Sequence, residues 1–320
     1  MIGSANGSGV SITGLACHAP ERVMTNAELA TLVDTSDEWI RERTGIRERR
    51  IAAEGEGLAD VSYPPCVAAL EQAGVKPEEI DLLIVATVTP DMPFPSTAAV
   101  LADRLGAHDA AAYDLAAGCT GYVYALAQAH GMLASGLCRR ALVVGADVLS
   151  TIVDWSDRST AVLFGDGAGA TVLERVGRPG FLAFELGADG SGGPQLYQPR
   201  GGYVHMNGRE VFKFATRVLV ASATKVLAEC GLGIEDVDLY VPHQANVRII
   251  DHAVTKLGIP KERVVINVDR YGNTSSASIP LALAEAVAGG RVQEGDTVLM
   301  TGMGAGLTWG SAVIDWTNGR

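Results

Sequence analysis

Apolar residues along the chain follow two different spacings. Short unbroken apolar runs at 82–85, 141–144, 239–241 and 297–300 are typical of buried strands. After residue 119 the spacing changes to that of a helix, with apolar side chains at Tyr122, Ala125, Leu126, Ala129 and Leu133. The alternation of the two patterns predicts an α/β protein.

The order of these elements is repeated within the chain. Residues 70–85 and 227–242 each read as a helix end, a glycine cap, an acidic turn and a buried strand. Further on, residues 118–120 and 272–274 each precede an Ala-rich helix, glycine and a second apolar strand. We therefore expect two copies of one α/β unit that meet near residues 176–181, with domains 1–176 and 177–320.

The repeat predicts which polar residues meet. Two related units packed about a pseudo-twofold axis bring the helix starts at Cys119 and Asn273 towards each other. His243 directly follows the apolar run 239–241, and ligands of α/β sheets gather at the carboxyl ends of strands. Cys119, His243 and Asn273 are the candidate catalytic residues.

Cys119 has the surroundings of a nucleophile. Small residues lie beside it at 116–118 and 121, and a helix is expected to begin there. Unpaired N–H groups and the positive end of the helix dipole favour a thiolate over a thiol, and the thiolate is the nucleophile. We expect a lowered pKa at this cysteine.

Each candidate also has a structural interpretation. A free cysteine is commonly a small buried core residue. His243 suits a hydrogen-bonded structural histidine, and Asn273 suits a turn or a helix N-cap. The three residues are more informative together than singly.

Composition narrows the class of protein. The chain has 320 residues, 48% hydrophobic and 19% charged, and a net charge of −12, which disfavours nucleic acid and requires a local basic patch for an acidic partner. Five scattered cysteines without a CxxC pair suit free thiols in a reducing cytoplasm. We expect no signal peptide, no membrane span and, since the histidines lack ligand spacing, no metal site.

Two glycine-rich stretches carry separate expectations. Residues 302–306 follow an apolar strand without a phosphate-loop lysine, so we expect their backbone N–H groups to face an oxyanion. Residues 165–170 are expected to allow close packing between the two halves.

Four motifs together resemble a known family. Residues 35–47, 164–170, 241–246 and 272–275 are similar to signatures of β-ketoacyl-acyl-carrier-protein synthase III, the initiating condensing enzyme of bacterial fatty-acid synthesis. The resemblance covers nearly the whole chain. It implies a thiolase-like fold with two duplicated halves in an αβαβα core, a homodimer and an acyltransferase that needs no cofactor.

The resemblance also implies a reaction. Cys119 would accept the acyl group of an acyl-CoA primer, for which we expect acetyl-CoA, while propionyl and branched primers stay open. His243 and Asn273 would stabilise malonyl-acyl-carrier protein as it loses CO2. The backbone N–H groups of Cys119 and Ala305 would form the second oxyanion hole.

Further roles come from the same resemblance. Trp39 and Arg158, with Arg43 nearby, would hold the CoA adenine, and Gly208 and Asn246 would line the pantetheine tunnel. Phe94 would reach into the acyl pocket of a partner subunit. The carrier-protein surface would comprise Gln244, Ala245, Asn246, Val247, Arg248, Lys213, Arg217 and Lys256.

The chain departs from the family pattern in a few places. Thr120 and Tyr122 add hydroxyls beside the nucleophile, and Met303 replaces the usual Phe, which puts acyl selectivity in question. Thr255 replaces a lysine that often precedes Lys256. A synthase III paralogue of a secondary pathway and a papain-like Cys-His-Asn hydrolase are the alternative functions; a binding-only protein would need no activated thiol.

Overall fold

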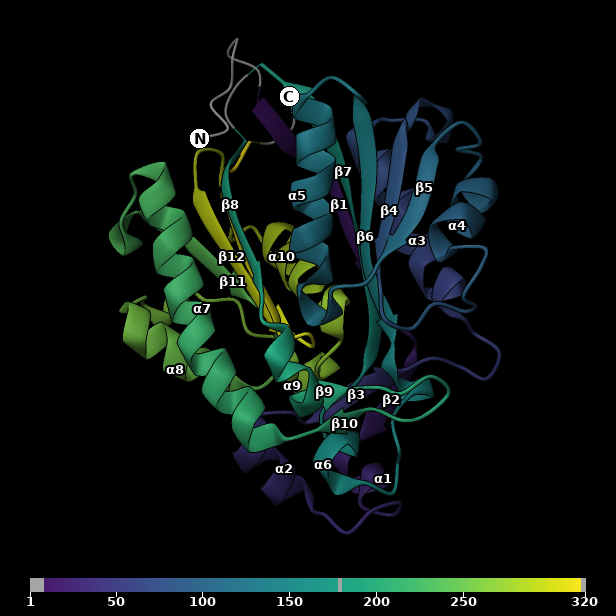
Figure 1. Cartoon of the computed structure of the whole chain (residues 1–320), viewed down its shortest axis with the longest axis vertical. Coiled ribbons are helices and arrows are strands. Elements are labelled where there is room, and N and C mark those ends of the chain that lie inside the picture. The colour runs from purple at the N-terminus through teal and green to yellow at the C-terminus, as the bar shows by residue number, and fades with distance from the viewer. Residues whose placement is uncertain (1–8, 178–179, 318–320) are drawn as a thin grey trace.

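The computed structural model describes residues 9–177 and 180–317, which form two large sheets that are each covered by helices on both faces (Figure 1), and two small sheets that pair β2 (Arg22–Thr25) with β3 (Glu48–Ile51) and β9 (Leu196–Tyr197) with β10 (His205–Met206). The first large sheet has the order β1-β7-β6-β4-β5 and the second the order β8-β13-β12-β11. The strands of the first are β1 (Gly9–His18), β4 (Leu82–Ala86), β5 (Ala111–Leu115), β6 (Arg140–Val148) and β7 (Asp166–Val176). Those of the second are β8 (Phe181–Ala188), β11 (Leu239–Pro242), β12 (Thr297–Gly304) and β13 (Thr308–Asp315).

The two sheets repeat the same pairing. In each, two parallel strands (β4 with β6, β11 with β12) continue into antiparallel partners, β7 and β1 in one half and β13 and β8 in the other. The first sheet adds β5, and at the matching position the second has only a bridge between Tyr240 and Val264. The predicted duplication is therefore confirmed, and β7 ends at Val176 shortly before β8 begins at Phe181.

Helices complete five layers. Between the sheets lie α5 (Gly121–Ala134) and α10 (Ser278–Ala288), which pack on strands of both halves. The outer face of the first sheet carries α3 (Leu58–Ala73) and α4 (Thr97–Leu105), and that of the second carries α7 (Gly208–Cys230) and α8 (Val247–Leu257). This αβαβα arrangement is the expected thiolase-like core.

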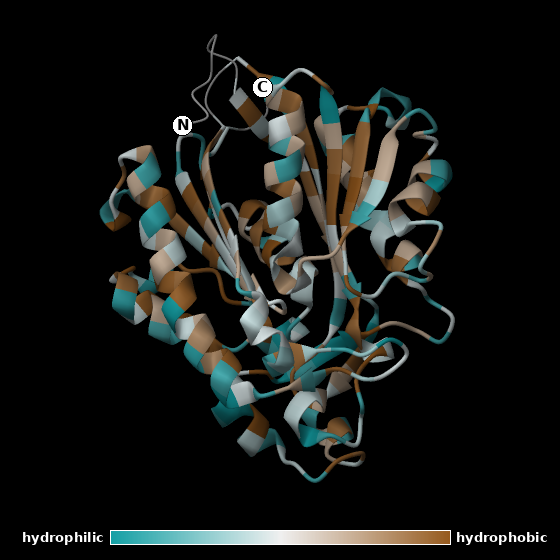
Figure 2. Ribbon diagram, viewed as in Figure 1, coloured by the Kyte–Doolittle hydropathy of each residue, from teal (hydrophilic) through white to brown (hydrophobic). Residues whose placement is uncertain are grey.

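Hydrophobicity explains which helices lie inside. Eight of the eleven residues of α10 are buried, as expected for a helix that is apolar on most sides. By contrast, α8 buries one stripe, Ile249, Ile250, Ala253 and Val254, and leaves its polar face outside. Figure 2 shows mainly brown strands in both sheets and alternating brown and teal bands on α7 and α8.

Glycines let the halves approach closely. A methyl group at Gly165 would lie 2.2 Å from the carbonyl oxygen of Tyr271, and one at Gly169 would lie 2.5 Å from Pro280 Cβ. Gly169 is in β7 and Gly165 directly precedes it, whereas Tyr271 and Pro280 belong to the C-terminal half. The expectation that residues 165–170 allow close packing between the halves is confirmed.

Shorter elements gather at one end of the sheets, the lower end in Figure 1. They contribute a separate apolar cluster that includes Ile40, Ile46, Leu149 and Val204. They are β2 (Arg22–Thr25), α1 (Asn26–Leu29), α2 (Asp37–Thr44), β3 (Glu48–Ile51), α6 (Arg158–Ala161), β9 (Leu196–Tyr197), β10 (His205–Met206) and α9 (Val268–Tyr271). Short 3₁₀ helices η1 (Pro77–Glu79), η2 (Gly118–Thr120), η3 (Leu149–Thr151), η4 (Gly190–Gln195), η5 (Ile234–Asp236), η6 (Lys261–Arg263) and η7 (Ser275–Ala277) join the larger elements.

Across the described part of the chain, no helix combines the length and the apolar content needed to cross a bilayer.

Candidate active site

Cys119 lies between a strand and a helix, as the sequence predicts. It is the middle residue of η2, after the end of β5 and directly before α5. Together with His243 and Asn273 it lines a cavity of about 410 Å³. The structure thus brings the three candidate residues, which are far apart in the sequence, to one site.

The expected lowering of the Cys119 pKa is wrong. Burial raises the pKa of this thiol to about 12, a hydrogen bond from Ser275 opposes that rise, and the carboxylate of Asp147 adds to it. Although the residue is partly exposed to the cavity, it lies deep within the protein, where an anion loses most of its hydration. Desolvation therefore outweighs the helix-end effect, and the resting group is a thiol.

His243 is held neutral at the end of β11. Its backbone N–H donates to Thr301 of β12 at 2.8 Å, and its Nδ1 lies 2.5 Å from the Ser278 hydroxyl. Burial lowers the pKa of the imidazole to about 3. Since Nδ1 is occupied by Ser278, Nε2 is the nitrogen left to face the cavity.

Asn273 is fixed by backbone contacts with the N-terminal half. Its N–H donates to Leu163 at 2.8 Å, and its carbonyl accepts from Gly165 at 3.0 Å. The side-chain Oδ1 accepts the N–H of Ser275 at 2.9 Å. The amide nitrogen is consequently the part of this side chain that remains to donate into the cavity.

The Gly-rich turn after β12 meets the nucleophile directly. A methyl group at Gly304 would lie 2.5 Å from the Cys119 nitrogen, and one at Gly118 would lie 2.8 Å from the Ala305 nitrogen. Only glycine leaves room for this approach. The N–H groups of Cys119 and Ala305 therefore lie at the same edge of the cavity.

The rim of the cavity carries an aromatic ring that two cations approach. The guanidinium carbon of Arg158 lies 5.0 Å from the centre of the Trp39 ring, and that of Arg43 lies 5.9 Å from it. All three residues line the cavity. Gly208, the first residue of α7, lines it as well.

Asn246 joins two elements of this rim. Its Oδ1 caps α8 by accepting the N–H of Arg248 at 2.8 Å, while its Nδ2 donates to the Arg43 carbonyl at 3.0 Å. It also lines the cavity. This residue therefore fixes the start of α8 against the end of α2.

The predicted surface role of Gln244 is wrong. Its side chain is 1% exposed. Its amide donates to the carbonyls of Pro242 and Val265 and accepts the N–H of Asn267. A buried and fully bonded amide cannot meet a partner protein, so Gln244 is a structural neighbour of His243.

The other predicted surface residues lie on α7, α8 and the turn before α8. Arg248, Lys256, Lys213 and Arg217 are exposed, whereas Ala245 and Val247 are half-buried. The Arg248 guanidinium lies over the Phe212 ring of α7, which lines the cavity. Lys213 is paired with Glu210 at 2.7 Å, which lowers the net positive charge of this surface.

Phe94 lies in the loop between β4 and α4 and is 83% exposed. The backbone of β5 is at the edge of the first sheet, and its nearest described neighbour is β4. An exposed phenylalanine and an open strand edge are features that another chain can cover.

The departures at Thr120 and Tyr122 do not alter the cavity. The Thr120 hydroxyl is paired with Thr308 at 3.0 Å, and that of Tyr122 with Thr171 at 2.5 Å. Both side chains are fully buried. Met303, in contrast, lines the cavity and is the departure that stays relevant to acyl selectivity.

Sequence reasoning did not identify the supporting hydroxyls. Ser275 has φ 51°, unusual for a residue with a side chain, and it serves both Asn273 and the Cys119 thiol. Its neighbour Ser276 donates through its N–H and its hydroxyl to the buried carboxylate of Asp147. The only signal in the sequence is the run of serines after Asn273, which is equally typical of a turn.

Within residues 9–177 and 180–317, no group of three or more His, Cys, Asp or Glu is arranged to hold a metal ion.

The cavity is lined by a buried thiol, a neutral imidazole and an amide, and it lies within a duplicated five-layer fold. These features define a thiolase-like acyl-transferring enzyme. Residues 113–190 match the family model 3-oxoacyl-[acyl-carrier-protein (ACP)] synthase III, and residues 227–316 match the model of its C-terminal part.

Individual relatives belong to the same family as the matching models. The chain is 55% identical to the β-ketoacyl-[acyl-carrier-protein] synthase III of Symbiobacterium thermophilum, with 96% of this chain and 98% of the relative covered. The corresponding protein of Geobacillus kaustophilus is 51% identical over 96% and 99% of the two chains. The 3-oxoacyl-[acyl-carrier-protein] synthase III structure from Aquifex aeolicus has a TM-score of 0.94 at 48% identity, covering 96% and 100%.

The chain therefore belongs to the 3-oxoacyl-[acyl-carrier-protein] synthase III family of condensing enzymes. The papain-like alternative is overturned, since both the fold and the family differ from those of such a hydrolase.

Proposed function

We propose that this enzyme condenses an acyl-CoA primer, acetyl-CoA in the first instance, with malonyl-acyl-carrier protein to start fatty-acid synthesis. The observation that carries the proposal is the meeting of Cys119, His243 and Asn273 on one cavity. Two anions arise in such a reaction, one at each thioester carbonyl, and this cavity has two separate sets of neutral donors. The family membership supports both substrates.

In the first half-reaction, Cys119 attacks the thioester carbonyl of the primer. A bond forms between Sγ and the carbonyl carbon, the bond from that carbon to the CoA sulfur breaks, and the thiol proton ends on CoA. The oxyanion between these events is stabilised by the N–H groups of Cys119 and Ala305, which lie at one edge of the cavity. Cys119 is a neutral thiol before the transfer, and CoA is a neutral thiol after it. A resting Cys119 thiol with a raised pKa is therefore compatible with this exchange.

In the second half-reaction, malonyl-acyl-carrier protein loses CO2 as its carbon–carbon bond breaks and the electron pair moves to the thioester oxygen. His243 and Asn273 donate to that oxygen. The enolate carbon then attacks the acyl carbon on Cys119, the bond from that carbon to Sγ breaks, and the Cys119 thiolate takes up a proton from solvent. A neutral imidazole suits this work, because a buried cation would be costly to desolvate.

The rim of the cavity is proposed to bind CoA. Trp39 and Arg158 contact each other at 5.0 Å, so an adenine stacked on both faces at about 3.5 Å requires Arg158 to turn outward. Gly208 and Asn246 would line the pantetheine arm below, and Arg43 would face the phosphates. The carrier protein would dock on Arg248, Lys256, Lys213 and Arg217, beside Ala245 and Val247.

The working form is proposed to be a homodimer in the cytoplasm. The open edge of β5 and the exposed Phe94 suit a second copy of the chain, with Phe94 entering the partner's acyl pocket. Five free cysteines and substrates made inside the cell suit a reducing compartment.

A two-stage assay tests the reaction. Exposure to acetyl-CoA alone should add one acetyl group to the protein at Cys119, measured by intact mass and peptide mapping. Addition of malonyl-acyl-carrier protein should then remove that group while CO2 and 3-oxoacyl-carrier protein form. Release of free acetate without condensation would contradict the proposal.

A role in a secondary pathway is the second candidate. It is favoured by the similarity to the priming β-ketosynthase of the R1128 polyketide biosynthetic pathway, at 39% identity and a TM-score of 0.92. A panel of acetyl, propionyl, branched and longer acyl-CoA primers distinguishes the two. A preference for a longer primer over acetyl-CoA would favour the secondary pathway.

A further inference from the structure

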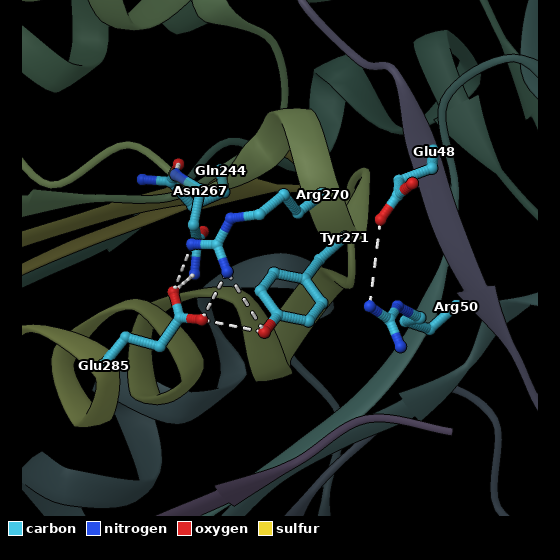
Figure 3. Close-up of polar contacts among 7 residues, drawn as sticks. All are labelled: Glu48, Arg50, Gln244, Asn267, Arg270, Tyr271 and Glu285. Atoms are coloured by element: carbon cyan, nitrogen blue, oxygen red, sulfur yellow. Dashed lines mark hydrogen bonds and ion pairs between the residues drawn. The ribbon is translucent and has the colours of Figure 1, made fainter. Parts of the chain in front are cut away.

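One carboxylate that is not among the residues lining the cavity accepts hydrogen bonds from three side chains. Glu285, on α10, accepts two hydrogen bonds from the guanidinium of Arg270, both at 2.8 Å. It also accepts one from Asn267 Nδ2 at 2.8 Å and one from the Tyr271 hydroxyl at 2.7 Å. Figure 3 shows all three donors converging on this carboxylate.

The first connection leads from Glu285 to His243. The backbone N–H of Asn267 donates to Gln244 Oε1 at 3.0 Å, so Asn267 binds Glu285 with its side chain and Gln244 with its main chain. Gln244 directly follows His243, and its side-chain nitrogen donates to the backbone carbonyls of Pro242 and Val265. The carboxylate therefore anchors the turn that aims His243.

The second connection leads from Glu285 to Asn273. Tyr271 donates to the carboxylate and is separated from Asn273 by Gly272 alone. The guanidinium carbons of Arg270 and Arg50 lie 5.0 and 5.9 Å from the centre of the tyrosine ring, which further limits its movement. Figure 3 shows Arg50 approaching this ring from β3. The same carboxylate therefore also anchors the turn that aims Asn273.

Charge strengthens both connections. Burial alone would raise the pKa of Glu285, but the bonds from Arg270, Asn267 and Tyr271 outweigh it and hold that pKa below its ordinary value. The group is thus ionised at neutral pH. Hydrogen bonds to an ionised acceptor are about twice as strong as neutral ones.

We propose that Glu285 is a positioning residue for the decarboxylation half-site, which holds His243 and Asn273 at a fixed separation from outside the cavity. This inference rests on the proposed function, in which those two side chains donate to one oxygen. A common anchor for the two turns limits changes in the distance between the two donors. Cys119 and Ala305, which serve acylation, are not connected to Glu285 by any of these bonds.

The test is Glu285→Gln measured in the two half-reactions separately. The neutral amide keeps the size of the side chain but cannot accept all four hydrogen bonds. We expect the kcat of malonyl-acyl-carrier-protein decarboxylation to fall about 10- to 100-fold, as for a small misplacement of catalytic groups. KM for that substrate and the rate of Cys119 acylation by acetyl-CoA should stay near the wild-type values.

Glu79→Gln is the matched control. Glu79 also accepts from an arginine at 2.8 Å, on Arg140, but it lies in η1 before β4, in the other half of the chain. This variant should keep both half-reactions. If Glu285→Gln does not fold, Tyr271→Phe removes a single bond to the carboxylate and should lower the same kcat to a smaller extent.

A double-mutant cycle gives a second measurement. If Glu285 acts through Asn273, adding Glu285→Gln to Asn273→Ala should cost a smaller factor than adding it to the wild type. Equal loss of both half-reactions, or unchanged decarboxylation in Glu285→Gln and Tyr271→Phe, would overturn the inference. The proposed function fails separately, if His243→Ala and Asn273→Ala themselves keep decarboxylation.

Discussion

The imidazole of His243 is oriented by Ser278, whose Oγ lies 2.5 Å from Nδ1. The same oxygen accepts the backbone N–H of Gln244 at 3.3 Å. Gln244 is a donor to this oxygen, so among the described contacts of Ser278 Nδ1 is the acceptor placed for the serine hydrogen. When the serine donates to Nδ1, the histidine carries its own hydrogen on Nε2. An Nε2–H group facing the cavity is a donor, as stabilisation of an enolate oxygen requires.

Ser278→Ala should therefore weaken decarboxylation selectively. The variant removes the partner that fixes the tautomer, and we expect the kcat of decarboxylation to fall about 10-fold. Acylation of Cys119 should continue at the wild-type rate, measured by mass spectrometry after rapid quenching. A variant that decarboxylates normally would show that Ser278 does not set the tautomer.

His243→Ala and Asn273→Ala should also slow decarboxylation selectively, and by a larger factor than Ser278→Ala. Each removes one donor from the enolate oxygen, and loss of such a donor typically costs about 10²–10³ in rate. Acylation by acetyl-CoA should be spared, because Cys119 and Ala305 serve that step. Release of CO2 from malonyl-acyl-carrier protein, followed with and without acetyl-CoA, is the measurement; equal loss of acylation would refute this division of roles.

The reactivity of Cys119 should rise with pH without a plateau near neutrality. The pKa of the buried thiol is about 12, so the thiolate fraction increases about tenfold per pH unit throughout the range in which the protein is handled. Alkylation by iodoacetamide between pH 7 and 9.5, quantified on the Cys119 peptide, reports this fraction. A plateau at pH 7 to 8 would show instead that the helix start lowers the pKa.

Two features of this site were predictable from the sequence and two were not. The duplication and the meeting of Cys119, His243 and Asn273 follow from local patterns, because similar segments adopt similar structures. The pKa of Cys119 depends on how completely other segments exclude water, which no local pattern records. Gln244 has a surface type of side chain, and only the positions of Val265 and Asn267 reveal that its amide is bonded inside.

Acid should destabilise the fold partly through His243. Its pKa is about 3 in the folded chain and about 6.5 when unfolded, so below pH 6.5 the unfolded chain takes up a proton that the folded chain does not. The free energy of unfolding therefore falls as the pH is lowered from about 6.5 towards 3. Between pH 7.5 and 5, His243→Gln should lose about 2 kcal/mol less than the wild type in urea titrations; equal losses would mean that the imidazole is hydrated.

The carrier-protein surface can be tested by reversing its charges. The chain carries a net charge of −12, so an acidic partner must be attracted by a local group of cations. Arg248 and Lys256 are exposed on α8, and Arg248 lies over Phe212, which lines the cavity. Lys213 contributes less than expected from sequence, because Glu210 is paired with it.

Arg248→Glu with Lys256→Glu should raise KM for malonyl-acyl-carrier protein about three- to tenfold, since exposed ion pairs contribute about 0.2–1 kcal/mol each and the new charges repel the partner. The increase should shrink as salt is added, because exposed charges are screened. KM for acetyl-CoA should not change. Lys76→Glu with Arg139→Glu alters the net charge equally in an exposed region of the other half and is the control. Equal impairment towards both substrates, or the same effect in the control pair, would exclude docking on α8.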